Sequence, residues 1–157
     1  MKPATTIHAS AAVVGDRGVI IRGESGSGKS SLLLALIAES EHVNALVADD
    51  RILVSVHHGR LVSAAPPELA GLIEVRGQGI LRRPFVSPAV IDLVVDLLPP
   101  ASCRRMPEPD ERVEIAGIAL PRLVLPAGQG DGALRVRVAL HDRFGGAQAS
   151  QPLALRA

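Results

Sequence analysis

The chain has 157 residues, 47% hydrophobic and 21% charged, so it is long and apolar enough to bury the core of one domain. Its net charge of +1 excludes a broad basic surface for duplex nucleic acid or for an anionic membrane. With two Phe, no Tyr and no Trp, it also excludes a single-strand nucleic-acid platform made of aromatic rings.

The first predicted elements are two strands, a glycine-rich loop and a helix. Residues 10–14 and 19–21 are short apolar runs joined by a turn at 15–18, and the second run is β-branched throughout. Residues 31–38 have the Leu and Ala content of a helix. The glycine-rich loop lies between strand and helix and reads Gly23-Glu24-Ser25-Gly26-Ser27-Gly28-Lys29-Ser30.

The glycine-rich loop matches the phosphate-binding P-loop pattern in full, in the strand–loop–helix context that this pattern requires. Its glycines let consecutive backbone N–H groups face one anion, and the start of the helix adds unpaired N–H groups. Lys29 can reach the β and γ phosphates of a nucleotide, and the Ser30 hydroxyl can ligate Mg²⁺. We therefore predict phosphate binding here. The alternative interpretation is a Gly- and Ser-rich surface turn that contains a lysine.

Two adjacent acids, Asp49 and Asp50, follow a predicted buried strand at 43–48. A P-loop protein places its metal-facing carboxylate at such a strand end. Adjacent residues of a strand point to opposite faces, so only one of the two acids can face the nucleotide directly. The alternative interpretation is a turn before the next strand, since Asp is common in turns.

The rest of the chain is predicted to be mostly strands. Apolar runs bounded by turn residues indicate strands at 52–56, 61–64, 90–98, 113–115, 118–120 and 123–125. Pro66-Pro67 is expected to open a short helical stretch through Ile73, followed by a loop at 77–79. Residues 101–112 are expected to form a mobile surface loop.

The segment 133–144 is ambiguous. Val and Leu alternate with Arg, which favours a strand, whereas Asp131 as an N-cap would favour a helix. The pattern alone favours the strand.

Cys103 is the only cysteine, so an internal disulfide and a cysteine-rich zinc site are both excluded. We expect a cytoplasmic protein, because a lone thiol suits a reducing compartment. No apolar run approaches the roughly 20 residues that span a bilayer, and the N-terminus is a poor secretory signal. We therefore expect neither a membrane nor a nucleic acid as partner.

Several charged residues have two interpretations each. His8 precedes the first strand and fits either the surface or a site. Glu74 and Arg76 fit either a solvated ion pair or an approach to phosphate or Mg²⁺. Arg104 and Arg105 fit either a solvated basic pair or the mobile arginine that phosphoryl transfer often recruits.

Together these segments resemble the bacterial HPr kinase/phosphorylase family in order and spacing, from about residue 5 to about residue 145. The matching segments are His8, the glycine-rich loop, 48–51, 64–67, 73–80 and 120–126. The resemblance implies an α/β fold with a P-loop nucleotide-binding core, a mixed β-sheet and flanking helices. It implies a catalytic domain over residues 1–145 and a C-terminal tail over 146–157. It also implies a short form without the N-terminal domain, and a helix at about 130–145.

The resemblance further implies an enzyme that uses ATP and Mg²⁺ to phosphorylate a serine on HPr, a phosphocarrier of the sugar phosphotransferase system. The same enzyme would remove that phosphate with inorganic phosphate and release pyrophosphate. Two other functions stay open: a nucleotide- or phosphate-sensing module with little turnover, and a small-molecule kinase. A homo-oligomer also stays open.

The resemblance assigns roles to individual residues. Asp49 is implied to deprotonate the incoming serine, with Asp50 and His8 orienting it. Lys29 would hold the phosphates, and Ser30 and Glu74 the metal. Arg105, or its neighbour Arg104, would serve the dephosphorylation. The sequence departs from the family pattern at Ala9, where Gly is usual, and at Ser31, the last residue of the predicted nucleotide-binding segment, where an acid is usual.

The shortage of aromatic residues predicts that a bound nucleotide is held by backbone N–H groups, Lys29 and a metal rather than by ring faces. We therefore expect loose specificity for the base, with GTP supporting the reaction within about tenfold of ATP.

Overall fold

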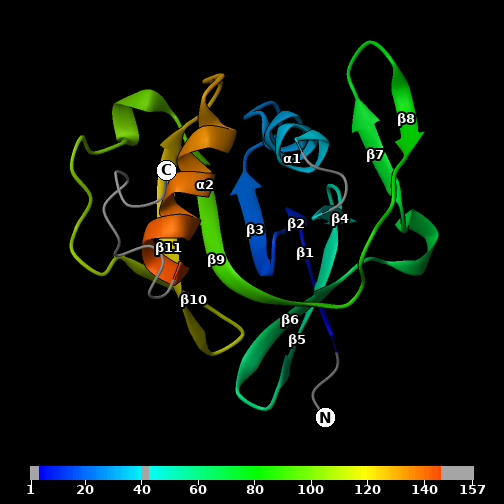
Figure 1. The fold of residues 1–157 in the computed structure, drawn as a ribbon, viewed down its shortest axis with the longest axis horizontal. Helices are drawn as coiled ribbons and strands as arrows, with labels where there is room; N and C mark the ends of the chain where they lie inside the picture. The colour runs from blue at the N-terminus through cyan, green and yellow to red at the C-terminus, as the bar shows by residue number, and fades with distance from the viewer. Residues whose placement is uncertain (1–3, 40–42, 146–157) are drawn as a thin grey trace, which may run out of the picture.

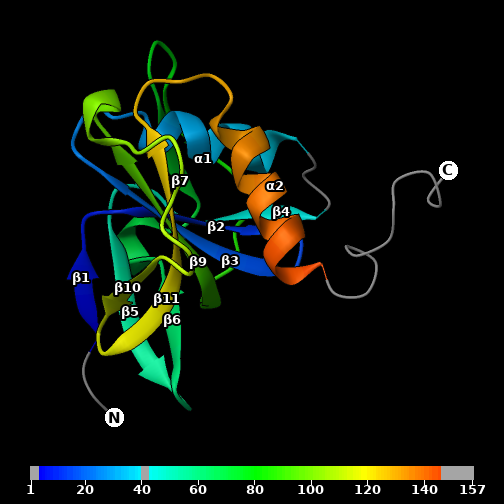
Figure 2. The same cartoon turned by 90° about the vertical axis from the view of Figure 1, so that its left-hand side faces the viewer.

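The computed structural model describes residues 4–39 and 43–145 and shows a curled mixed sheet that carries both described helices on one face (Figure 1, Figure 2). The helices are α1 (Lys29–Ala38) and α2 (Gly132–Phe144). Within the described residues, nine strands form the sheet, and β7 (Leu72–Val75) and β8 (Gly79–Arg82) form a separate hairpin. The predicted mixed α/β fold is confirmed.

The nine strands of the sheet are β1 (Thr5–Ile7), β2 (Ser10–Val14), β3 (Arg17–Gly23), β4 (Asn44–Ala48), β5 (Ile52–His57), β6 (Arg60–Ala64), β9 (Ala89–Leu98), β10 (Arg112–Ile115) and β11 (Ile118–Pro126). Their order is β1-β5-β6-β9-β3-β2-β4, with β11 on β9 and β10 on β11. Two short 3₁₀ turns, η1 (Pro67–Leu69) and η2 (Pro100–Ser102), connect strands.

Four strands end at the same edge of the sheet. β9 pairs in parallel with both β3 and β11. β4 and β3 are both antiparallel to β2, so β4 also runs in this direction. The glycine-rich loop follows β3, and Asp49 and Asp50 follow β4. In open α/β sheets, ligands bind in the crevice outside the carboxyl ends of the strands, so this edge is where a site is expected.

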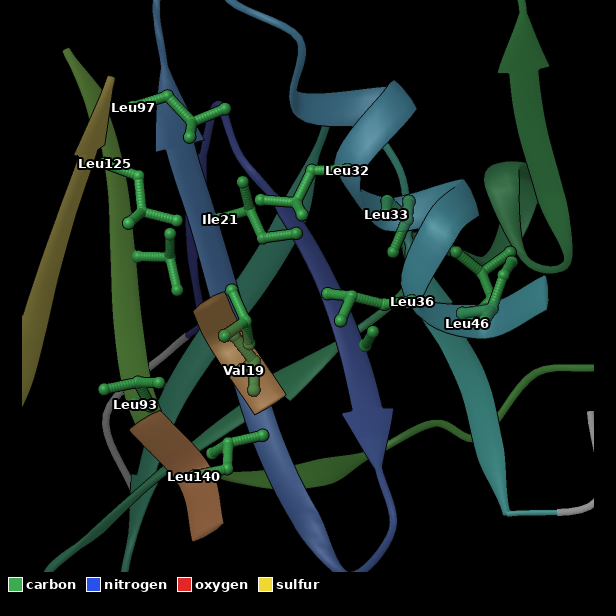
Figure 3. Packing of buried hydrophobic residues seen from close by; sticks show 14 of the residues in the cluster. Val19, Ile21, Leu32, Leu33, Leu36, Leu46, Leu93, Leu97, Leu125 and Leu140 are labelled. Atoms are coloured by element: carbon green, nitrogen blue, oxygen red, sulfur yellow. The ribbon is translucent and has the colours of Figure 1, made fainter. Parts of the chain in front are cut away.

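The core lies on both faces of the sheet and is aliphatic, as the composition predicts. On the face toward the helices, Val19 and Ile21 of β3 belong to one buried cluster with Leu32, Leu33 and Leu36 of α1, and Ile21 lies beside Leu32 (Figure 3). Ile20 belongs to a second buried cluster, which includes residues of β5, β6 and β10. This alternation is the period of two that a strand buried on both sides shows. Among the described residues, no aromatic side chain is fully buried.

The strand predicted at 133–144 is wrong, because this segment is α2. Val136 and Leu140, four residues apart, are buried against the core, whereas Leu134 and Val138 are 54% and 52% exposed. Burial therefore follows the helical period. The alternation of apolar residues with arginines, which favoured a strand, does not match the residues that are buried. The helix that the family resemblance implied is confirmed.

Two further differences lie in the middle and at the end of the chain. The predicted helical stretch through Ile73 ends at Leu69, and Ile73 belongs to β7, paired with Leu81 of β8. The predicted loop at 77–79 overlaps the turn of this hairpin at 76–78, and Gly79 is already the first residue of β8. The two segments predicted at 118–120 and 123–125 are one strand, β11, which continues through Pro121.

β1 has no counterpart among the predicted strands. The predicted C-terminal tail, 146–157, lies outside the described residues, and the division at residue 145 stays a prediction. The longer of the two described helices has 13 residues, fewer than the roughly 20 needed to cross a bilayer.

A buried ion cluster joins the parallel strands β3, β9 and β11 just before their carboxyl ends. Asp96 of β9 is 4% exposed and accepts two hydrogen bonds from Arg22 of β3, at 2.7 and 2.8 Å. Arg122 of β11 donates to the same carboxylate at 2.6 Å. Burial opposes the ionisation of Asp96, but the hydrogen bonds and charges of both guanidinium groups outweigh it, so the pKa of Asp96 lies below its usual value.

Candidate functional site

The glycine-rich loop (residues 23–30) is curled around the side chain of Lys29. The Lys29 Nζ donates hydrogen bonds to the backbone carbonyls of Gly23 and Glu24, at 2.8 and 3.1 Å. The N–H of Ser27 donates to the same Glu24 carbonyl at 3.0 Å. The ammonium group is therefore bound by two neutral carbonyls of the loop. Negatively charged oxygens of a ligand can replace these carbonyls as its partners.

Two glycines of the loop occupy positions that disfavour a side chain. A Cβ at Gly23 would lie 2.4 Å from the Ser27 Oγ, closer than two such atoms can approach. Gly28, the residue before α1, has a φ of 98°, in the left-handed region that side chains disfavour. The backbone conformation of the loop therefore explains the glycines at these two positions of the pattern.

Asp49 is buried at the end of β4, with 6% of its surface exposed. Its Oδ1 accepts hydrogen bonds from the hydroxyls of Ser10 and Ser30, at 2.8 and 2.9 Å. Its Oδ2 accepts from the backbone N–H of Glu74 at 3.1 Å, and from Ser30 at 3.1 Å. One carboxylate therefore connects β2, the start of α1 and the hairpin β7–β8.

Asp50, the next residue, lies in a different environment. Its φ is 65°, and the N–H of Arg51 donates to the carbonyl of Asp49 at 2.7 Å, so the chain turns tightly here. The side chain of Asp50 is 69% exposed, and its Oδ1 lies 2.7 Å from the Nε2 of His8. Such strained backbone at a non-glycine residue concentrates at functional sites. The two adjacent acids thus differ in exposure and in partners.

A cavity of about 450 Å³ brings most of the predicted site residues together. Four separate parts of the chain form it: the link between β1 and β2, the loop with the start of α1, the turn after β4, and the hairpin β7–β8. Its lining residues are His8, Ser25, Gly26, Gly28, Lys29, Ser30, Ser31, Leu34, Asp50, Glu74, Val75 and Arg76. Carboxylates, an imidazole, an ammonium and a guanidinium therefore face one space, a composition suited to phosphate groups, a metal ion and a proton transfer.

Asp49 and Arg105 do not line this cavity. Asp49 lies behind it, bound to Ser30. Arg105 is in the exposed segment between η2 and β10, and it makes no hydrogen bond or ion pair with another described residue. Its neighbour Arg104 forms an ion pair with Glu108. The structure therefore does not bring Arg105 to the other predicted site residues.

Among the described residues, no group of three or more His, Cys, Asp or Glu side chains could hold a metal ion by itself. The donors near the loop are oxygens: the Ser30 hydroxyl, the Asp49 carboxylate and the exposed Glu74 carboxylate. Mg²⁺ prefers oxygen ligands, and it commonly takes one or two from the protein and the remainder from phosphates and water. These residues therefore fit Mg²⁺ together with a nucleotide.

Sequence reasoning missed Ser10 and the backbone N–H of Glu74, the two partners that hold Asp49 from outside the loop. Ser10 is 0% exposed in β2, next to buried alanines. A serine at the start of an otherwise apolar strand was the only signal of a buried polar contact. The Glu74 contact is made by the backbone, so side-chain types could not predict it.

Comparison with known proteins gives the family. The model of the HPr serine kinase C-terminal domain family matches residues 1–140 of the chain. The chain belongs to this family. It is 34% identical over 141 residues to the HPr kinase/phosphorylase of Geobacillus thermodenitrificans, covering 83% of this chain and 45% of that protein. The corresponding protein of Caldicellulosiruptor bescii is 37% identical over 141 residues, covering 83% of this chain and 44% of its own length.

The chain thus spans about half the length of the curated HPr kinase/phosphorylases that it matches. A solved structure, the HPr(Ser) kinase/phosphatase from Coxiella burnetii, superimposes with a TM-score of 0.76 at 28% identity. This superposition covers 88% of the present chain and 95% of the Coxiella chain. The HPr serine kinase family therefore accounts for the fold of the described residues as well as for their sequence.

Proposed function

We propose that this member of the HPr serine kinase family transfers the γ-phosphoryl group of ATP to a serine hydroxyl of an HPr-type phosphocarrier protein. We also propose the reverse reaction, in which inorganic phosphate attacks the phosphoserine and pyrophosphate leaves. The observation that carries the proposal is the cavity in which the exposed Asp50–His8 pair faces the same space as Lys29. Phosphoryl transfer needs positioning, charge neutralisation and one proton acceptor, and these side chains can supply all three.

The geometry favours Asp50 rather than Asp49 as the proton acceptor. Asp50 is open to the cavity, and its carboxylate has one side-chain partner, His8. Asp49 is buried and already accepts hydrogen bonds from three residues. A group that takes a proton from a substrate hydroxyl must reach that hydroxyl, so the role that the family resemblance implied for Asp49 is better suited to Asp50. Asp49 instead positions Ser30 and the wall of the cavity.

Lys29 and the loop would hold the nucleotide phosphates. When ATP binds, phosphate oxygens replace the carbonyls of Gly23 and Glu24 around the Lys29 Nζ. Ser30, Asp49 and Glu74 are the residues that would hold Mg²⁺, which when bound neutralises the charge that develops on the phosphates. Arg76 lines the same cavity and can neutralise a further phosphate charge.

In the forward direction, Asp50 takes the proton from the serine as its oxygen bonds to the γ-phosphorus and the bond to the β-phosphate oxygen breaks. In the reverse direction, an oxygen of inorganic phosphate attacks the phosphoserine, and the serine oxygen leaves. Asp50 then passes the proton of the attacking phosphate to the leaving serine oxygen. In both directions the Asp50 carboxylate carries the proton, and His8 holds this carboxylate in place.

The test is to incubate the purified chain with HPr, ATP and Mg²⁺ and to look for a mass increase of one phosphate on a serine. Serine-phosphorylated HPr with inorganic phosphate should release pyrophosphate. Lys29→Ala should abolish both reactions, whereas Arg112→Ala, which removes an exposed cation paired with Asp110, should retain them. ATP binding without any transfer would instead indicate a sensing module, and labelling of a metabolite but not of HPr would indicate a small-molecule kinase.

A further inference from the structure

The hydroxyl of Ser27, inside the glycine-rich loop, is buried but has no hydrogen-bond partner in the chain. Ser27 is 9% exposed, and its Oγ neither donates to nor accepts from another group of the protein. Among the side chains that the structure describes, one other hydroxyl is buried in the same way, that of Ser63 in β6. A buried hydroxyl without a partner costs free energy, so its presence in the loop calls for an explanation. The phosphoryl transfer proposed above does not use it.

The Ser27 hydroxyl packs against Gly23, the first residue of the loop. A Cβ on Gly23 would lie 2.4 Å from the Ser27 Oγ, so the hydroxyl lies close to the Cα of Gly23. The carbonyl of Gly23 accepts its hydrogen bond from another donor, the Lys29 Nζ, at 2.8 Å. The hydroxyl and the ammonium group are therefore both neighbours of Gly23, and of the two only the ammonium group bonds to its carbonyl.

The two carbonyls that bind Lys29 differ in what they keep when Lys29 turns to a ligand. The carbonyl of Glu24 also accepts the N–H of Ser27 at 3.0 Å, so it retains a donor. The carbonyl of Gly23 loses its bond to Lys29. The hydroxyl of Ser27 is a donor without another partner, and rotation about a single side-chain bond redirects it.

We propose that Ser27 is a positioning residue whose hydroxyl takes over the Gly23 carbonyl when Lys29 turns to the phosphates of a bound nucleotide. This inference rests on the proposed function, because it presumes that phosphates draw Lys29 away from the loop. The new hydrogen bond replaces the lost one and keeps the loop curled while Lys29 holds the ligand. A hydroxyl that gains a partner only on binding favours the complex, so Ser27 raises the affinity for phosphates through the loop backbone.

Thermal unfolding without any ligand tests the exchange of donors directly. In the wild type, Ser27→Ala removes a hydroxyl that has no partner, so the melting temperature should stay the same or rise. Lys29→Ala removes the donor from the Gly23 carbonyl, so in that background the hydroxyl is already bonded. Adding Ser27→Ala to Lys29→Ala should therefore lower the melting temperature by about 2–4 °C. A serine that only fills space would not show this difference between the two backgrounds.

Titration calorimetry with ATP and with inorganic tripolyphosphate, each with Mg²⁺, tests the effect on binding. Ser27→Ala should weaken both ligands by the same factor, about threefold to tenfold, because both recruit Lys29 through phosphates alone. The matched control is Ser63→Ala, which removes the other buried hydroxyl without a partner, at a residue that does not line the site cavity. It should leave both dissociation constants unchanged and should not lower the melting temperature.

The inference is overturned if Ser27→Ala lowers the melting temperature of the wild type as much as that of Lys29→Ala. It is also overturned if Ser27→Ala leaves both affinities unchanged, if it weakens ATP but not tripolyphosphate, or if the wild type binds neither ligand. Failure of the proposed function gives a different result. In that case both experiments give the expected values, but no phosphate reaches HPr.

Discussion

The Nε2 of His8 lies 2.7 Å from the Oδ1 of Asp50, although 42 positions separate the two residues in the sequence. The pairing of β1 with β5 brings them together, since Ile7 is opposite Ile52. Both side chains are more than half exposed, and both line the site cavity. A carboxylate oriented by an imidazole in an open cavity is a suitable proton carrier for a hydroxyl substrate.

The two adjacent acids should respond differently to the same substitution. Asp50→Asn removes the proposed proton acceptor and should lower kcat for HPr phosphorylation by about 10²–10⁴-fold, with the dissociation constant for ATP little changed. Asp49→Asn replaces a carboxylate oxygen with an amide donor among three donors, so it should lower the melting temperature and weaken ATP-Mg²⁺ binding. Steady-state kinetics, calorimetry and thermal unfolding measure these effects. Normal turnover by Asp50→Asn would refute its role.

We propose that His8 acts through Asp50, so a side chain that keeps one donor should keep part of its effect. His8→Gln can still donate a hydrogen bond to the Asp50 carboxylate, whereas His8→Ala cannot. We expect kcat to fall in the order wild type, His8→Gln, His8→Ala, with about a tenfold loss for the alanine variant and an unchanged KM for ATP. Equal losses for both variants would show that the hydrogen bond is not what His8 contributes.

The Asp96 cluster should make stability depend on acid pH. Because the pKa of Asp96 in the folded chain lies below its usual value of 3.8, its contribution is fully present above pH 3.8. It is lost as the pH falls through the folded-state pKa. Asp96→Asn should therefore lower the free energy of unfolding by about 3 kcal/mol at pH 7, since two partly buried guanidinium groups lose their counter-charge.

The measurement is urea unfolding of wild type and Asp96→Asn between pH 7 and pH 3. The difference between the two should shrink as the pH falls below 3.8. Asp16→Asn is the matched control, because the side chain of Asp16 is 92% exposed and the substitution should have little effect at any pH. A difference for Asp96→Asn that is constant with pH would mean that its charge is not the stabilising feature.

Helix α2 offers a direct test of which face is buried. Leu140→Ala removes a side chain that is 7% exposed and should destabilise the chain by about 2–5 kcal/mol. Leu134→Ala, the same substitution at a residue 54% exposed on the same helix, should cost less than about 0.5 kcal/mol. Chemical denaturation measures both. Equal effects would contradict the orientation of α2 and favour the strand that the sequence pattern suggested.

The local motifs of the site were predictable from sequence because each depends on neighbouring residues. The curl of residues 23–30 follows from its glycines and from the strand and helix on either side. The position of Asp49 and Asp50 follows from the apolar strand before them. The meeting of these segments in one cavity was implied by the family resemblance, and the parallel direction of β3 and β4 brings it about.

The different environments of Asp49 and Asp50 were not predictable, because they depend on contacts distant in the sequence. Ser10 and the backbone of Glu74 enclose Asp49, and His8 pairs with Asp50. The sequence pattern also failed to predict helix α2. Its arginines alternate with apolar residues as in a strand, but only Val136 and Leu140 are buried. In both cases tertiary packing outweighs the local signal.

The buried carboxylate of Asp49 has a consequence for redesign. It fixes the spacing of β2, the start of α1 and hairpin β7–β8 through four hydrogen bonds to one side chain. Hairpin β7–β8 shares no ladder with the main sheet, so this contact and the buried Ile73 set much of its position. An engineer who wishes to admit a larger substrate by moving one wall of the cavity must therefore first supply new partners for Asp49. Changes confined to the exposed tip of the hairpin leave that anchor untouched and are the safer starting point.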